Sequence, residues 1–235
     1  MSFLPLLSAL VPAIVLLGYI YWRDRKSPEP VKQLLKATAW GVVAIPLTLA
    51  IVYPLQWIGI IPDEFTTIGG AIYDAFMSAA IPEELSKLLL LWLFLRNNPY
   101  FDERMDGIVY AVFVSLGFAA LENFMYLFGE EESVLSMGIS RALFAVPAHF
   151  GFGILMGYYY SKARFCTRNR STNRALILIA PILAHGLYDA ILFALPNVAP
   201  IISGGLTIVF IAFCWKMWKQ GSLRIQKLLN EDFEA

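Results

Sequence analysis

The chain has few charged residues and very little histidine. Only 15% of its 235 residues are charged and two are histidines, whereas 58% are hydrophobic. A soluble domain normally carries about 25% charged and about 45–50% apolar residues, so this composition indicates a protein of the lipid bilayer. The formal net charge is +0. No basic stripe runs through the sequence, which excludes nucleic acid as an expected partner.

Cysteines and repeated segments are also scarce. Cys166 and Cys214 are the only cysteines and form no C-x-x-C pair, which argues against a zinc knot or a disulfide framework. There is no internal repeat of the kind that marks many secondary transporters, and no low-complexity linker. We therefore interpret residues 1–235 as a single polytopic membrane domain whose motif-bearing core covers about residues 75–195.

Seven apolar runs are each near the ~20 residues that cross a bilayer as a helix. They are Leu4–Tyr21, Ala37–Trp57, Ala75–Leu95, Ile108–Phe128, Leu135–Tyr160, Ala175–Leu195 and Ile201–Trp218. The first run lacks a basic leading segment and a small-residue cleavage site, so we expect a retained span. Asp63–Asp74 is predicted to be a short interfacial helix. Ser222–Phe233 is predicted to be an amphipathic surface helix or a frayed tail.

Loop charges predict the orientation of these spans. Lys and Arg follow the first, third, fifth and seventh runs, whereas the loops after the second and fourth runs carry Asp and Glu. The positive-inside rule then places the N-terminus outside and the C-terminus in the cytoplasm. The expected fold is an all-α integral membrane bundle of about seven transmembrane helices.

The segment from Ile81 to Lys87 places two carboxylates and an ammonium in an otherwise apolar run. On a helix, Glu83 and Glu84 lie four and three residues before Lys87, so all three groups share roughly one side. Such groups are costly at membrane depth and usually face a bundle interior or a watery cavity. A purely structural pairing, in which Lys87 only neutralises a glutamate, is the simpler alternative. Arg141, near the outer end of the fifth run, is expected to extend outward to the interface.

Other polar residues fall inside the next three runs. They are Glu122 and Asn123 in the fourth run, His149 in the fifth, and His185 and Asp189 in the sixth. At about 1.5 Å per helical residue, the glutamate pair and both histidines come close to the midplane, and Glu122 and Asp189 lie slightly further out. We therefore expect the active site to lie within the bilayer.

This residue set suits metal-assisted hydrolysis. A catalytic zinc takes three His, Glu or Asp ligands and leaves a fourth position for a water whose pKa falls to about 7. A further carboxylate can then act as general base and later as general acid. The same buried groups could instead form the relay of a proton- or ion-coupled transporter, which is the alternative function.

Two further patterns concern the shape of the helices. Gly153 and Gly157 form a G-x-x-x-G that predicts close packing of two helices. Pro82 and Pro147 each stand beside a key polar residue, and we expect them to kink or locally open their helices.

Four motifs give the chain a resemblance to a known family. Glu83-Glu84-Leu85-Ser86-Lys87 is similar to the E-E-x-x-K of PrsW-type intramembrane proteases, which belong to the superfamily of CAAX- and bacteriocin-processing enzymes. Phe118 to Glu122 resembles the family's F-x-x-x-E, His149 to Gly153 its H-x-x-x-G, and His185 to Asp189 its H-x-x-x-D. The motifs follow in order on four successive runs.

The resemblance implies a multi-pass protease of the bacterial plasma membrane, metal-dependent with zinc as cofactor, surrounded by lipids. Its substrate would be a membrane-anchored protein. PrsW-type members are known for the first cleavage of a transmembrane anti-sigma factor in stress signalling. In CAAX-type relatives the second motif ends in His, so Glu122 favours the PrsW branch. The chain contains neither H-E-x-x-H nor G-x-S-x-G, so other intramembrane protease classes are not supported.

We predict that Glu83 or Glu84 polarises the attacking water. His149 and His185 would hold zinc, with Glu122 as a third ligand or a water-holding group. The sequence leaves open which of the two glutamates polarises the water, because adjacent side chains project about 100° apart around a helix. It also leaves open whether catalysis uses a metal or glutamate and histidine alone.

Three residues are predicted to support this site. Asp189 would orient His185 or join the metal shell, Lys87 would tune the glutamate pair, and Asn123 lies next to Glu122. The oligomeric state is not predicted.

Overall fold

The structure is a computed structural model that describes residues 4–62, 65–129 and 134–234, and these residues form helices and no strands. The helices are α1 (Leu4–Arg23), α2 (Val31–Trp57), α3 (Ile68–Asp74), η1 (Ala75–Ala80), α4 (Ile81–Leu95), α5 (Arg104–Gly129), α6 (Val134–Ser140), η2 (Arg141–Ala145), α7 (Val146–Phe165), α8 (Arg170–Ala194), η3 (Leu195–Asn197) and α9 (Pro200–Phe233).

Within the described residues, five helical runs are each long and apolar enough to cross a membrane. They are Val31–Trp57, Arg104–Tyr126, Ser136–Phe165, Arg170–Asn197 and Pro200–Phe233. The other two predicted spans correspond to α1 and to the run of α3, η1 and α4. The chain is therefore an all-α multi-pass membrane protein.

The short helix predicted over Asp63–Asp74 is present from Ile68 to Asp74, and its interfacial position stays a prediction. α3 continues into η1 without a break, because Asp74 and Ala75 at the junction both keep right-handed helical backbone angles. Residues 63–64 lie outside the described residues. The third span therefore belongs to one helical run from Ile68 to Leu95.

Both helices that carry a proline beside a polar residue contain a wider π-helical segment just before it. η1 ends two residues before Pro82, and η2 ends two residues before Pro147. Proline lacks an N–H and its ring clashes with the carbonyl four residues earlier, and a π-helical turn is a known way to accommodate such an interruption. The predicted local opening is confirmed, and it immediately precedes the polar residues of α4 and α7.

α5 is the central helix of the bundle. α1, α2, α4, α7 and α9 all pack against it, and nearly all its side chains from Met105 to Ala119 are buried. A methyl group on Gly157 of α7 would collide with the backbone of Gly107 and Ile108, and one on Gly41 of α2 would collide with the Val114 carbonyl. The packing role predicted for the G-x-x-x-G is thus confirmed, since only glycine permits this approach.

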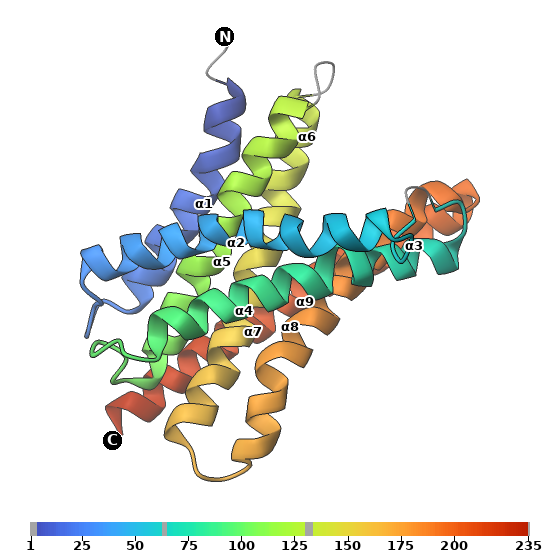
Figure 1. Cartoon of the computed structure of the whole chain (residues 1–235). Coiled ribbons are helices and arrows are strands. Elements are labelled where there is room, and N and C mark those ends of the chain that lie inside the picture. Colours follow the sequence, from blue (N-terminus) through green and yellow to red (C-terminus); the bar gives the residue numbers. More distant parts are fainter. Residues whose placement is uncertain (1–3, 63–64, 130–133, 235) are drawn as a thin grey trace.

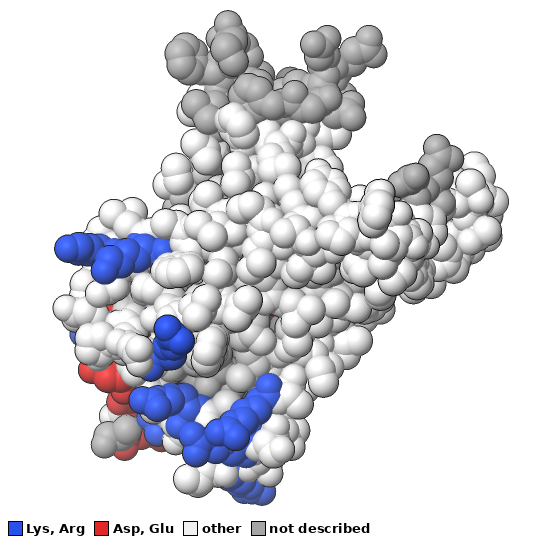
Figure 2. All heavy atoms as spheres, in the orientation of Figure 1, with Lys and Arg blue, Asp and Glu red and all other residues white. Residues whose placement is uncertain are grey.

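The helices converge at the end that holds the C-terminus and diverge toward the other end (Figure 1). α1, α5 and α6 extend in one direction, and the far end of α2 extends with α3 in another. Figure 2 shows that the Lys and Arg side chains visible in that view gather at the convergent end. The positive-inside rule predicts that this basic end faces the cytoplasm.

Acidic groups lie at the same end, and all of those named here except the exposed Asp102 are buried. Glu29, Asp102 and Asp106 have carboxylate oxygens within 4.8 Å of one another, and Glu29 also contacts the Tyr110 hydroxyl. Burial, with the nearby Glu29 carboxylate, raises the pKa of Asp24 to about 8. The basic end therefore holds carboxyl groups as well as basic ones, and some of its cations have acidic neighbours.

The C-terminal segment forms the last part of α9 and is docked on the bundle. Ile225 and Leu228 are fully buried in the main hydrophobic cluster. The Asp232 carboxylate accepts hydrogen bonds from the backbone N–H groups of Arg104 at 3.0 Å and Met105 at 2.8 Å. Both expectations for Ser222–Phe233, a surface helix and a frayed tail, are wrong, because this segment buries apolar side chains and caps α5.

We expect Asp232→Ala to lower the free energy of unfolding by about 1 kcal/mol or more, since it removes a helix cap and an ion pair with Arg104. Thermal unfolding of the detergent-solubilised protein measures this. Asp232→Asn, which keeps an acceptor oxygen, should lose less. Glu234→Ala, at an exposed position two residues later, is the matched control. Equal melting temperatures for Asp232→Ala and the control would show that the cap does not contribute.

Candidate active site

Four helices bring the eight predicted site residues into one connected cluster. The members are Glu83, Glu84 and Lys87 of α4, Glu122 and Asn123 of α5, His149 of α7, and His185 and Asp189 of α8. All are buried except Glu122, which is partly exposed. The residues predicted at similar depths are thus in side-chain contact, and Asn123 joins the cluster through Arg141, which contacts both Asn123 and Glu122.

The Lys87 ammonium is the hub of this cluster. Its Nζ lies 3.2 Å from Glu83 Oε2, 2.9 Å from Glu84 Oε1 and 3.1 Å from His149 Nδ1. It also stands 4.0 Å above the centre of the Phe118 ring. The structural pairing considered from the sequence exists, but Lys87 does more than neutralise a glutamate, because it also joins α4 to the histidine of α7.

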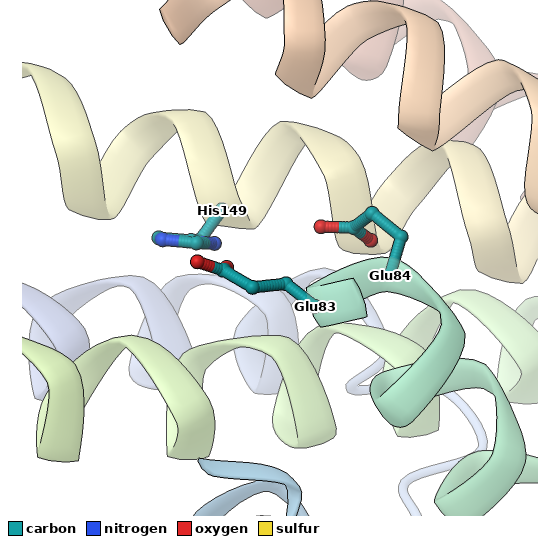
Figure 3. A group of neighbouring side chains, drawn as sticks. All are labelled: Glu83, Glu84 and His149. Atoms are coloured by element: carbon teal, nitrogen blue, oxygen red, sulfur yellow. The ribbon is translucent and has the colours of Figure 1, made fainter. Parts of the chain in front are cut away.

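The two neighbouring glutamates face different surroundings. Glu83 lines a cavity of about 370 Å³ between α2, α4 and α5, and a second cavity of about 270 Å³ that both histidines also line. Glu84 lines neither cavity and is fully buried. Figure 3 shows the Glu83 carboxylate extending toward the His149 ring, with the Glu84 carboxylate separate from it. Water and substrate can therefore reach Glu83.

His149 is held from both ring nitrogens and from its backbone. Its Nε2 lies 3.0 Å from Glu122 Oε2, and its Nδ1 faces Lys87. The Ser115 hydroxyl donates to the His149 carbonyl at 2.7 Å. This carbonyl belongs to the helix just after the π-helical segment, where Pro147 disturbs the regular backbone pattern. The imidazole therefore has a fixed orientation toward the cavity.

His185 lies between carboxylates of two helices. Its Nδ1 is 2.9 Å from Glu84 Oε1, and its Nε2 is 3.1 Å from Asp189 Oδ2 and 4.0 Å from Glu83 Oε2. The ring stacks on Phe152, with centres 4.6 Å apart. When Nδ1–H donates a hydrogen bond to Glu84, Nε2 and the facing oxygens of Asp189 and Glu83 are all acceptors. Such a group of acceptors requires a proton or a cation.

Arg141 is the functional candidate that the sequence reasoning placed wrongly. Its Nη2 lies 2.7 Å from Glu122 Oε2, and its Nε donates to Asn123 Oδ1 at 2.6 Å. It lines the same cavity as the histidines instead of extending to the interface. The signal that was missed is the balance of buried charges. Lys87 pairs with Glu83 and Glu84 on its own helix, so Glu122 needs a different cation, and Arg141 provides it.

One group of donors at this site could hold a divalent metal, and it differs from the predicted ligand set of His149, His185 and Glu122. Ligand atoms of Glu83, Glu84 and His149 lie within 4.8 Å of one another. Glu84 Oε2 is buried and has no hydrogen-bond partner among the described residues. Ligands at about 2.0–2.1 Å from tetrahedral zinc stand roughly 3.3 Å apart. The separations from His185 Nε2 to Asp189 and Glu83, 3.1 and 4.0 Å, bracket that value.

The larger cavity connects the site with an apolar face of the bundle. Its walls include Ile45, Leu49 and Val52 of α2 and Phe118 and Met125 of α5. Polar groups are few, and the carboxylates of Glu83 and Glu122 are among them. An apolar chain segment can therefore reach the carboxylates without crossing a charged surface.

Comparison with known proteins gives one consistent result. A family model described as "PrsW family intramembrane metalloprotease" matches residues 29–217, which include every predicted site residue. Protease PrsW of Bacillus subtilis strain 168 is 38% identical over 191 residues, 81% of this chain and 83% of that protein. Protease PrsW of Clostridioides difficile strain 630 is 35% identical over 215 residues, 90% of this chain and 87% of that protein. No solved structure gives a significant match.

We expect Lys87→Met to destabilise the fold by about 3–5 kcal/mol, because it leaves two buried carboxylates without their cation. The double variant Lys87→Met/Glu84→Gln should recover part of that loss, since one unpaired charge is then removed. Thermal unfolding of the wild type, Lys87→Met, Glu84→Gln and the double variant gives a double-mutant cycle that measures the coupling between the two residues. Additive losses would show that Lys87 and Glu84 are not energetically coupled.

Proposed function

The chain belongs to the PrsW family of intramembrane metalloproteases, and from this premise we propose that it cleaves a membrane-anchored protein at the site around Glu83, His149 and His185. The observation that carries the proposal is that Glu83 and both histidines, from three helices, line one cavity inside the bundle. Membership of a protease family favours proteolysis over the alternative function, a proton- or ion-coupled transporter. The substrate proposed from the motif resemblance is a transmembrane anti-sigma factor, and the proposed location is the bacterial plasma membrane.

In this mechanism Glu83 is the general base. Its carboxylate faces the cavity, where it accepts a proton from the attacking water and later returns that proton to the leaving amine. Glu84 is excluded from the cavities and cannot meet the substrate in this arrangement. The choice that the sequence left open is therefore assigned to Glu83.

His149 and His185 are proposed to hold zinc, with Glu122 as third ligand or water-holding group. Zinc, when bound, lowers the pKa of its water to about 7 and polarises the substrate carbonyl. His149 Nε2 and Glu122 Oε2 are 3.0 Å apart, which suits two neighbouring ligands. Arg141 balances the charge of Glu122 and contacts the same oxygen, Oε2, at 2.7 Å.

The surrounding residues keep the two imidazoles oriented. Glu84 and Asp189 hold His185 from its two nitrogens, at 2.9 and 3.1 Å. Lys87 donates to His149 Nδ1 and to one oxygen of Glu83, so His149 Nε2 carries the ring proton and would have to release it to bind a metal there. Ligand orientation by such partners typically changes metal affinity or activity by about 10–100-fold.

Substrate would reach the site laterally through the apolar cavity between α2, α4 and α5. A transmembrane segment of the substrate can place apolar side chains against Ile45, Leu49 and Val52. The peptide bond must leave helical geometry there, since backbone groups in a regular helix are shielded by their own hydrogen bonds. Arg141 lies within reach of the same cavity system and supplies a fixed positive charge near the developing oxyanion.

The first test uses a purified single-span substrate with a tag at each end. Glu83→Gln should reduce cleavage by at least about 100-fold, because a general base is lost. Glu84→Gln should retain more activity, since it only loosens His185 and Lys87. Glu103→Gln, at the basic end and bonded to Ser27, is the matched control. Full cleavage by Glu83→Gln would contradict the assignment, as would a larger loss in Glu84→Gln.

The second test addresses the metal. Elemental analysis of purified wild type should give about one zinc per chain, and a His149→Ala/His185→Ala variant should lose it. A melting curve of each sample shows whether the variant is folded. Zinc retained by the folded double variant would remove these histidines from the ligand set. Full activity of the wild type under strong chelation would favour glutamate and histidine acting without a metal.

A further inference from the structure

A third cavity, of about 430 Å³, lies at the basic end, away from the candidate active site. It is bounded by α4, α7, α8 and the loops at their ends. Four arginines contribute to its wall, and no acidic residue does. The arginines are Arg96, Arg164, Arg170 and Arg174. All four are solvent-exposed. The Arg170 Nε donates to the Ala163 carbonyl at 2.8 Å, which leaves the two terminal nitrogens of its guanidinium group for a ligand.

These arginines differ from other cations at the same end. Arg104 and Lys162 form ion pairs with Glu231 or Asp232 at 2.7–3.7 Å. Within the described ranges, no ion pair involves any of the four cavity arginines. Four like charges around one hollow repel one another, and an anion in the hollow relieves that repulsion.

The positive-inside rule alone does not account for this arrangement. It explains why basic residues lie on one side of the membrane, but it does not require them to surround one cavity. Arg168 and Lys219, equally exposed, lie outside the cavity wall. The four arginines come from separate segments, at the end of α4, near the end of α7 and in the first turns of α8. Their convergence is therefore a product of the fold.

The rest of the wall is apolar or aromatic. Trp92, Leu95, Phe101 and Ile177 line it together with Tyr160. Trp and Tyr are typical of the membrane–water interface, where headgroups and acyl chains meet. A free phosphate ion would use only the arginines, whereas a phospholipid would also cover the apolar part of this wall.

We propose that this cavity binds the phosphate headgroup of an anionic phospholipid. Arginine recognises phosphate oxygens with two parallel hydrogen bonds, and basic pockets between transmembrane helices are established sites for anionic headgroups. The bound lipid connects the cytoplasmic ends of α4, α7 and α8. Those helices carry Glu83, His149 and His185, so the lipid fixes their relative positions. The lipid-binding proposal does not rest on the catalytic mechanism proposed above.

The test uses delipidated full-length protein in detergent, titrated with short-chain phosphatidylglycerol and followed by native mass spectrometry and thermal unfolding. Phosphatidylglycerol should bind and raise the melting temperature by several degrees. Phosphatidylcholine should bind at least about tenfold more weakly, because it lacks net negative charge. Inorganic phosphate should neither match the stabilisation nor displace the lipid at equal concentration.

Variants locate the binding to the cavity. Arg164→Gln/Arg174→Gln should weaken phosphatidylglycerol binding about tenfold or more, while Arg168→Gln/Lys219→Gln, with the same loss of charge, should bind like wild type. Equal losses in both variants, or equal binding of the two lipids by wild type, would overturn the proposal. Stabilisation by inorganic phosphate equal to that by phosphatidylglycerol would assign the cavity to a soluble anion instead. The lipid comparison on wild type decides the matter even if a variant fails to fold.

Discussion

The arrangement of the site depends on one buried cation. An ammonium in the hydrocarbon region is tolerated only when anions and acceptors surround it, and Lys87 finds two glutamates and an imidazole nitrogen. Because both glutamates lie on the same helix as Lys87, these contacts fix which side of α4 faces the site. Because the imidazole comes from α7, the same ammonium fixes the distance between the two helices. Buried groups of opposite charge therefore specify here how the helices pack.

Proline and glycine set the geometry around this cation. The π-helical segments before Pro82 and Pro147 add backbone just ahead of the polar residues, which changes the direction in which the following side chains point. Gly41 and Gly157 let α2 and α7 approach the backbone of α5 from two sides. A central helix that is almost wholly buried then provides the fixed frame from which Glu122 reaches His149.

Sequence reasoning could predict depth but not lateral neighbours. Helical rise is uniform, so the positions of His149 and His185 in their spans were enough to place them in one layer. The partner of Arg141 could not be predicted in the same way, because a side chain of that length reaches either the interface or a neighbouring helix. The packing of Ile225 and Leu228 was missed for a related reason: an amphipathic segment looks the same whether lipid or protein covers its apolar face.

The adjacent glutamates have different surroundings, and the proposed mechanism gives them different roles. Neighbours on a helix face about 100° apart, and of these two residues Glu83 lines both cavities at the site whereas Glu84 lines neither. In the proposed mechanism Glu83 faces water and substrate and therefore needs a carboxylate that can change its protonation state. Glu84 is fully buried, where it holds Lys87 and His185 and so must remain charged. A single glutamate would have to serve both purposes, and each protonation during turnover would then weaken the contacts that keep α4 and α8 together.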